Sequence, residues 1–472
     1  MSVAPRAALA SRAPVLPEAA RPLATVAAVV SSLLLGVVLA RSLPLGVAGI
    51  MAALYTPIVL VSLPAALALW AGVIAIEFLP VTSVGPKLAG LMVLAAWVAV
   101  MSSRRMAGER PFRIARVPIA LVALLVVWLT ITFLWARDAG QVGTRVWEWY
   151  VALAVFAVCA TAPRLRSDVR LLVLGFVGGA FVSVVVGFVD TGLHTSATAL
   201  ESSAGVEGRL VGGSGDPNYL AAGLVPAIAL AGGAMIVFRN TLLRLGLVVA
   251  AAVCALGLFA TQSRGGLVAA AAALVCALFV ARGHRMQVVG IVAMLVAVGL
   301  WWAAANPAAV ERILETDDGG TGRSELWRVA WNVWEDNPVI GVGLNNYVEV
   351  SHEYARQAGS LEFGELIAER RILVHNGYLQ MLAEAGVIGL LLFLAVIAAA
   401  VRAAWLAARR FDRLGDRAFA GLARTVIIAQ VGALAAAFFL SYAQDKRLWI
   451  LLALGPALLA IAHGRARQGG VA

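Results

Sequence analysis

A histidine and two arginines stand where polar segments of this chain meet long apolar runs. His375 directly precedes the apolar run 376–400, and Arg264 is the single charge in the polar turn 261–266. Arg323 lies in a polar stretch that is rich in charges and tryptophan. A guanidinium keeps its charge and suits phosphate oxygens, while an imidazole at a helix start has a lowered pKa that favours its use as a neutral base. These side chains therefore suit chemistry on a phosphate-linked substrate.

A further polar cluster opens the apolar run 217–237. Asp216 and Asn218 stand at its start, on either side of a proline, and Arg209 lies just ahead of them. Aspartate followed by proline is also an ordinary helix N-terminus. The cluster is thus compatible with a binding role and with a purely structural one.

His375 and Arg264 likewise fit plain structural roles, the first as a surface histidine that caps a helix and the second as an anchor in lipid head groups. A functional role is favoured over these structural ones, because four segments that are distant in the sequence bring polar clusters to one face of the membrane. We predict a pocket there for a lipid-linked diphosphate: arginines stabilise its charge as it leaves, and His375 removes the proton of an attacking hydroxyl. The predicted residues are His375, Arg264 and Arg323 for catalysis, and Arg209, Asp216, Asn218, Asn345, Asn376 and Tyr347 for substrate binding.

The composition is that of a membrane protein. Of the 472 residues, 61% are hydrophobic and 13% are charged, and the mean hydropathy is +0.90. Soluble proteins carry about 25% charged residues, so an ordinary soluble globule and a disordered chain are excluded. The net charge of +11 is explained by basic loops that stay in the cytoplasm, so we expect contact with membrane lipids and no nucleic acid. The three cysteines lie in apolar runs and fit small core residues rather than disulfides or zinc ligands.

Membrane-spanning helices need roughly 20 mainly apolar residues each. We therefore expect an all-α polytopic membrane protein with about 12–14 transmembrane helices. The candidate spans lie near residues 23–40, 45–62, 64–80, 86–102, 117–136, 148–162, 169–189, 217–237, 243–260, 265–281, 286–304, 376–400, 420–441 and 447–463.

The distribution of basic residues predicts the orientation. With the N-terminus in the cytoplasm, most arginines of the connecting segments fall inside and nearly all acids fall outside, as the positive-inside rule requires. The C-terminus is then cytoplasmic too. The chain divides into a cytoplasmic tail (1–22), a transmembrane bundle (23–304), a large extracytoplasmic catalytic loop (305–375), C-terminal transmembrane helices (376–463) and a second cytoplasmic tail (464–472).

The loop 305–375 is expected to contain short helices. Ser324–Glu335 has apolar residues at helical spacing, which predicts an amphipathic helix along the membrane surface or over a cavity. Residues 341–347, GVGLNNY, follow it. Two glycines spaced by one residue allow a tight turn, which either links two surface helices or cradles a phosphate. Asp317 and Asp318 are adjacent in a glycine-rich turn, and we assign no metal or cofactor to the chain.

Two glutamates fall inside predicted spans. Glu384 follows His375 by nine residues, which is about 13.5 Å along a helix. An acid at this depth is costly unless it is paired, so we expect Glu384 to tie its span to an arginine of a neighbouring helix. Glu77 lies in the run 64–80 without an evident partner, and we expect it to reach toward the membrane interface.

The order of these motifs resembles the O-antigen ligase and polymerase superfamily, the multispan enzymes of bacterial surface-glycan assembly. Each motif is short, but their order around one large outer loop is more specific. The resemblance covers roughly residues 209–400, whereas the N-terminal spans share only topology. The motifs are GDPNYLA (215–221), SRGG (263–266), GRSELW (322–327), GVGLNNY (341–347) and HNGYLQMLAEAGVIGL (375–390).

This resemblance implies a GT-C-like membrane glycosyltransferase that inverts the anomeric centre without a metal. The donor would be a glycan on undecaprenyl diphosphate. The acceptor would be a hydroxyl of a glycan or of a lipid-linked molecule at the outer face of the bacterial cytoplasmic (inner) membrane. The family's essential arginines match Arg264 and Arg323, and its essential histidine matches His375.

Three activities share this donor: surface polysaccharide polymerase, O-antigen ligase and protein O-oligosaccharyltransferase. A transporter or flippase of lipid-linked glycans is an alternative of a different class. Transporters often show inverted repeats, broken helices and charged midplane residues. This sequence shows no repeat and gathers its polar residues at one face, which favours an enzyme.

Overall fold

The computed structural model describes residues 41–79, 84–109, 112, 114–189, 208–281, 283–314, 323–357 and 372–468, and these residues form helices and connecting turns without any strand. Ten of the described helices are long and apolar enough to cross a membrane. The prediction of an all-α polytopic membrane protein is thus confirmed. The first predicted span, 23–40, lies outside the described residues.

The described residues of the first half of the chain form six longer helices and two short ones. They are α2 (Leu43–Val61), α3 (Leu63–Val73), η2 (Ile74–Ile76), α4 (Gly85–Met106), α5 (Arg116–Ile131), η3 (Thr132–Leu134), α6 (Ala139–Thr161) and α7 (Arg166–Val189).

The second half carries the predicted motifs. Its described helices are η4 (Gly212–Ser214), α9 (Pro217–Val237), α10 (Thr241–Ala260), α11 (Arg264–Val280), α12 (Arg285–Ala305), α13 (Pro307–Leu314), α14 (Arg323–Asp336), α15 (Tyr347–Gln357), α17 (Gly377–Arg413), α18 (Arg417–Ala436) and α19 (Lys446–Gln468).

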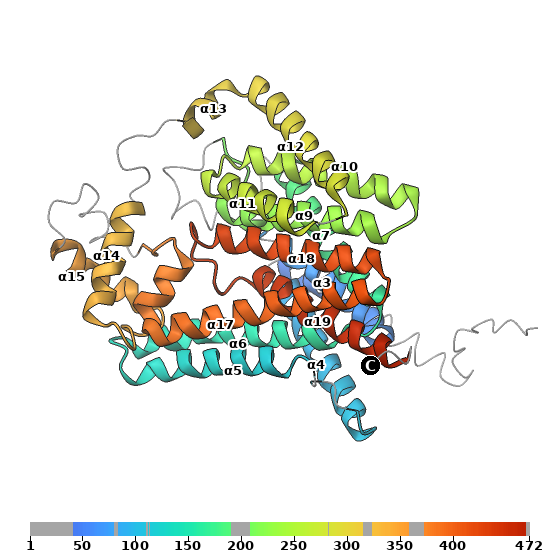
Figure 1. Cartoon of the computed structure of the whole chain (residues 1–472). Coiled ribbons are helices and arrows are strands. Elements are labelled where there is room, and N and C mark those ends of the chain that lie inside the picture. Colours follow the sequence, from blue (N-terminus) through green and yellow to red (C-terminus); the bar gives the residue numbers. More distant parts are fainter. Residues whose placement is uncertain are drawn as a thin grey trace, which may run out of the picture.

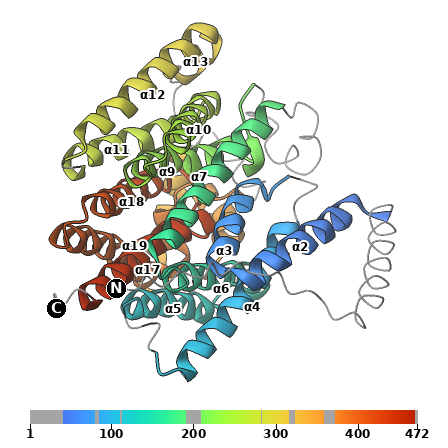
Figure 2. The same ribbon diagram turned by 90° about the vertical axis from the view of Figure 1, so that its right-hand side faces the viewer.

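Helices α9, α18 and α19 are the most buried of the candidate spans. Helix α12 lies at the periphery of the bundle, with most of its surface exposed (Figure 2). Small residues permit the closest helix contacts, as is usual in membrane bundles. A Cβ at Gly175 of α7 would meet the backbone carbonyl oxygen of Ala68 of α3 at 1.9 Å. The α3–α7 contact therefore depends on glycine.

The two ends of the bundle differ in chemistry. Helices α14 and α15 lie at one end, and the C-terminus lies at the other (Figure 1). The second end holds ion pairs of Arg164 with Glu109 and of Arg166 with Asp416. We refer below to the first as the loop end and to the second as the basic end.

Several helices are longer than their apolar runs. Helix α6 was predicted at 148–162 but begins at Ala139, because the carboxylate of Asp138 accepts hydrogen bonds from the N–H groups of Gly140 and Gln141. A cap of this kind starts a helix within polar sequence. The predicted span 376–400 continues as α17 to Arg413.

Helix α17 is also interrupted. Gly386 has φ 67° and ψ −170°, a conformation that residues with a Cβ do not adopt. The break divides α17 into a short half, Gly377–Ala385, and a long half from Val387 onward. The short half places His375 and Asn376 at the loop end.

Candidate active site

The N-terminus of α9 is built by a tight turn and a cap. Gly215 has φ 74°, and Asp216 follows it as the N-cap residue. One carboxylate oxygen of Asp216 accepts hydrogen bonds from the N–H groups of Asn218 at 2.7 Å and Tyr219 at 3.0 Å. Asp216 is therefore held in a fixed orientation.

Arg209 and Asn218 connect this turn to the start of α11. The Nε of Arg209 donates to the carbonyl oxygen of Thr261 at 2.9 Å, and its Nη2 donates to Oδ1 of Asn218 at 3.1 Å. The hydroxyl of Ser263 donates to the same Oδ1 at 2.8 Å. Ser263 is in turn the N-cap of α11, whose first residue is Arg264. The side chain of Arg264 is exposed at this end.

Arg323 begins α14, as the amphipathic pattern predicted within one residue. The helix is positioned by Trp327, whose ring contacts Phe438 and Phe439 between α18 and α19. Burial lowers the pKa of Arg323, and the positive charge of Arg264 lowers it further, while the carboxylate of Asp216 opposes both effects. Arg323 therefore lies within electrostatic reach of both Arg264 and Asp216.

His375 stands directly before the N-cap of α17. The side chain of Asn376 accepts hydrogen bonds from the N–H groups of Tyr378 at 3.1 Å and Leu379 at 3.0 Å. His375 itself has φ 53°, a left-handed conformation that is uncommon for residues other than glycine. Such positions concentrate at functional sites.

The surroundings of His375 favour its neutral form. Burial lowers the pKa of the imidazole, and the charge of Arg323 lowers it further, against the opposing effect of Asp216. A neutral imidazole can accept a proton. The structure thus brings His375, Arg323, Asp216 and Arg264 together at the loop end, from four segments that are far apart in the sequence.

The GVGLNNY segment seals the break in α17. The N–H groups of Val342 and Gly343 donate to the carbonyl oxygens of Ala383 at 3.0 Å and Glu384 at 2.8 Å. The N–H group of Val387 donates in return to Pro338 at 2.9 Å. The backbone groups that the break releases are therefore satisfied by this loop. The N–H groups of Val342 and Gly343 are occupied by the protein, which fits the turn explanation and not a phosphate cradle.

Glu384 and Asn345 lie at the centre of this contact. The N–H group of Asn345 donates to Oε2 of Glu384 at 2.9 Å, and Nε2 of Gln380 donates to Oε1 at 3.0 Å. The side chain of Asn345 bonds to Gln141 at 2.9 Å and receives a hydrogen bond from Arg145 at 3.4 Å. Glu384 is thus satisfied mainly by amide groups, and the arginine expected beside it acts through Asn345.

Tyr347 is fully buried in an apolar cluster that fixes α14 and α15 to the short half of α17. Its hydroxyl donates to the carbonyl oxygen of Leu326 at 3.3 Å, and Leu326 and Val333 are buried with it. The observed contacts of Asn345 and Tyr347 are structural, in contrast to those of the four grouped residues. Their roles in substrate binding remain predictions.

Residues 249–394 match the family model of O-antigen ligase. This segment contains Arg264, Arg323 and His375 and ends beyond the break in α17. The match supports the resemblance of this part of the chain to the O-antigen ligase and polymerase superfamily. No curated protein matches the chain.

An ionic cluster at the start of α19 was not expected from the sequence. Glu77 accepts a hydrogen bond from Nζ of Lys446 at 2.5 Å, so the expectation that Glu77 lacks a partner was wrong. The neighbouring Arg447 pairs with Asp445 at 2.7 Å and donates to the hydroxyl of Ser214 at 2.9 Å. The sequence signal for this cluster was the run of three charged residues, Asp445, Lys446 and Arg447, at the start of an apolar segment.

Ser214 lies two residues before Asp216, so the cluster holds the turn that orients this carboxylate. Arg447 is buried, and a buried cation requires a partner of opposite charge. Within the described residues, no group of three or more histidines, cysteines or acids is arranged to hold a metal ion. The pair Asp317–Asp318 lies outside the described residues.

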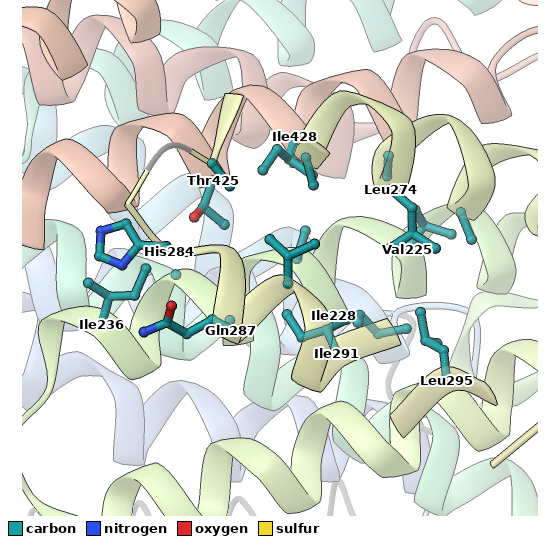
Figure 3. Close-up of a pocket in the computed structure, with 18 residues that line it drawn as sticks. Val225, Ile228, Ile236, Leu274, His284, Gln287, Ile291, Leu295, Thr425 and Ile428 are labelled. Carbon is teal, nitrogen blue, oxygen red and sulfur yellow. The ribbon is translucent and has the colours of Figure 1, made fainter. Parts of the chain in front are cut away.

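An apolar crevice runs along α11, away from Arg264. It offers about 660 Å³ of open space between α9, α11, α12 and α18. Figure 3 shows Val225, Leu274 and Leu295 at one side of it and His284 and Gln287 at the other. Its first lining residue on α11 is Ala270, six residues from Arg264, or about 9 Å along the helix.

Proposed function

We propose that this chain is an integral-membrane glycosyltransferase that moves a glycan from undecaprenyl diphosphate to a hydroxyl acceptor. It would act at the outer face of the bacterial cytoplasmic membrane, as a surface polysaccharide polymerase or an O-antigen ligase. The observation that supports this proposal best is the grouping of His375, Arg323, Arg264 and Asp216. The family match covers three of these four residues.

The proposed reaction is a direct displacement at the anomeric carbon of the donor. A lone pair of the acceptor hydroxyl forms the new C–O bond while the bond from the anomeric carbon to the diphosphate oxygen breaks. The hydroxyl proton passes to the neutral imidazole of His375, and polyprenyl diphosphate leaves with the bonding electrons. Attack from the side opposite the leaving group inverts the anomeric centre.

Arg323 and Arg264 have complementary parts in this proposal. Arg323 lies within electrostatic reach of Arg264 and of the carboxylate of Asp216, and negative charge grows on the diphosphate as it leaves. Preorganised cations at such a position stabilise the transition state. Partial burial of Arg323 strengthens its interaction with the diphosphate, because the local dielectric constant is lower than that of water.

The lipid part of the donor would lie in the crevice along α11. An isoprenoid chain is apolar, and the crevice begins about 9 Å from Arg264 along the helix axis. Its lining is almost wholly aliphatic, with Val225, Ile228 and Leu274 among its residues. A diphosphate held by Arg264 thus has an apolar channel beside it.

The break in α17 does not favour the transporter alternative. Broken helices in transporters expose backbone groups to the transported substrate. Here the released groups bond to residues 338–345 of the same chain. The acid at the break is buried and bonded to Gln380 and Asn345.

The proposal is tested with the purified protein and one purified undecaprenyl-diphosphate repeat unit. Ladders of product from this donor alone would identify a polymerase. Transfer that begins only when a second acceptor is added would identify a ligase, or a protein O-oligosaccharyltransferase if that acceptor is a polypeptide. Absence of transfer to glycan, lipid and polypeptide acceptors, from a protein that remains folded, would contradict the proposal.

A further inference from the structure

A second cationic hollow lies at the basic end, away from the candidate active site. It has about 460 Å³ of open space and is formed where α17 and α19 end. Its lining consists of three arginines, one histidine and two leucines: Leu406, Arg409, Arg410, Arg413, Leu459 and His463.

None of the described residues that line this hollow is acidic. Arg409 and Arg413 are one helical turn apart, so their like charges repel each other. Within the described part of the chain, neither has a carboxylate partner. The nearest acids along the sequence are engaged elsewhere, Asp412 with Arg424 and Asp416 with Arg166. A bound anion would relieve the repulsion.

Arg410 is held in place by His463. The Nδ1 of His463 lies 2.8 Å from the carbonyl oxygen of Leu459, which places the ring proton on that nitrogen. The Nε2 of His463 then accepts a hydrogen bond from Nη1 of Arg410 at 2.5 Å. Only one of the guanidinium N–H groups is used in this contact, so Arg410 retains donors for a ligand.

The surroundings of the hollow indicate the source of the anion. Trp405 and Leu406, on the turn of α17 before Arg409, are 45% and 38% exposed. Tryptophan beside an apolar surface is typical of the membrane interface. A ligand in this hollow would meet cations at one side and a hydrocarbon surface at the other, which is the chemistry of an anionic phospholipid.

We propose that the hollow between α17 and α19 binds the phosphate group of an anionic phospholipid, with Arg409, Arg410 and Arg413 as its ligands and the acyl chains along Trp405 and Leu406. The site is independent of the glycosyl transfer proposed above, since it lies at the opposite end of the bundle. Basic pockets between membrane helices bind anionic head groups in this manner.

Native mass spectrometry of the detergent-solubilised full chain tests this site. The probes are phosphatidylglycerol, phosphatidylcholine and inorganic phosphate. We expect phosphatidylglycerol to bind, with roughly 30-fold weaker affinity in the variant Arg409→Ala/Arg413→Ala, since each cation adds about fivefold to the affinity at a lipid surface. Phosphatidylcholine should bind equally to both proteins.

The variant Arg105→Ala is the matched control. Arg105 is exposed at the end of α4, at the same end of the bundle, and lies outside the hollow. Equal loss of phosphatidylglycerol in the control and in the double variant would show a general effect of charge and would overturn the site. Unchanged affinity in the double variant would overturn it too. Displacement of the lipid by millimolar inorganic phosphate would show that a free phosphate is the ligand and contradict the lipid assignment.

Discussion

The backbone N–H group of Asn345 donates to the carboxylate of Glu384 at 2.9 Å. This bond joins the loop after α14 to the short half of α17, which begins beside His375. The carboxylate therefore acts at a distance from the proposed chemistry, through the position of the helix start. The hydrogen bonds that Glu384 accepts from Asn345 and Gln380 also explain why an acid is tolerated where the chain enters an apolar run.

Two substitutions of Glu384 should show whether the protein depends on its hydrogen-bond acceptor or on its negative charge. Glu384→Ala leaves the N–H group of Asn345 without its buried partner, so we expect a loss of about 1–3 kcal/mol in the free energy of unfolding and a lower kcat. Glu384→Gln retains an oxygen acceptor and should be closer to the wild type in both measurements. Thermal unfolding in detergent and transfer rates provide the comparison. Equal effects of the two substitutions would show that the charge, not the hydrogen bond, is important.

The rate should depend on pH through the imidazole of His375. Burial and the charge of Arg323 lower its pKa, so the neutral base should persist below the ordinary histidine pKa of about 6.5. The transfer rate should be constant near pH 7 and fall only as the pH drops through this lowered pKa. The pH profile of kcat for the wild-type protein measures it.

The pH profile of a variant at Arg323 provides a second test. In Arg323→Gln, the loss of the nearby positive charge should raise the pKa of His375, so the acidic limb of the residual activity should move to higher pH. A wild-type limb above about 6.5, or a limb that does not move in this variant, would contradict the assignment of His375 and Arg323 as neighbours in the reaction.

The crevice along α11 predicts a dependence on the length of the lipid. Ala273 is buried and lines the crevice, so Ala273→Phe should obstruct it. We expect KM for an undecaprenyl donor to rise about tenfold, which is the loss of one or two buried methylene contacts, while a donor with a short isoprenoid is unaffected. Val275→Phe, which adds the same ring at an exposed position of α11, is the control. Equal effects on both donors would exclude the crevice as the lipid site.

Chelation tests the predicted independence of metal. The chemistry assigned to Arg264 and Arg323 supplies positive charge to the leaving diphosphate without a divalent ion. Treatment with EDTA should therefore leave the transfer rate unchanged. Loss of activity that Mg²⁺ restores would show that a metal supplies this charge instead.

Much of the fold follows from the sequence because apolar length alone decides which segments can cross a membrane. Thirteen of the predicted spans correspond to described helices. Ten of these helices are long and apolar enough to cross a membrane, and the other three are shorter. The ends of the helices were harder to predict from the sequence. Helix α6, for example, begins within a polar stretch because Asp138 caps it. The break at Gly386 could not be predicted, because glycine also occurs in unbroken membrane helices.

For the site, topology was sufficient to bring four polar segments to one end. The partners of Glu77 were not predictable, because Lys446 is 369 residues away in the sequence. The roles of Asn345 and of the turn 341–343 could not be predicted either, because they depend on which backbone groups the break in α17 releases. A local pattern carries no information on such a long-range requirement.

The most direct test of the account is a single-turnover assay with purified lipid-linked donor and acceptor, comparing the wild-type protein with His375→Ala. Loss of a general base typically costs a factor of about 10² to 10⁴ in rate, and we predict a decrease of this size with donor binding and thermal stability retained. Transfer by His375→Ala at the wild-type rate would contradict the central claim that this imidazole takes the proton of the acceptor.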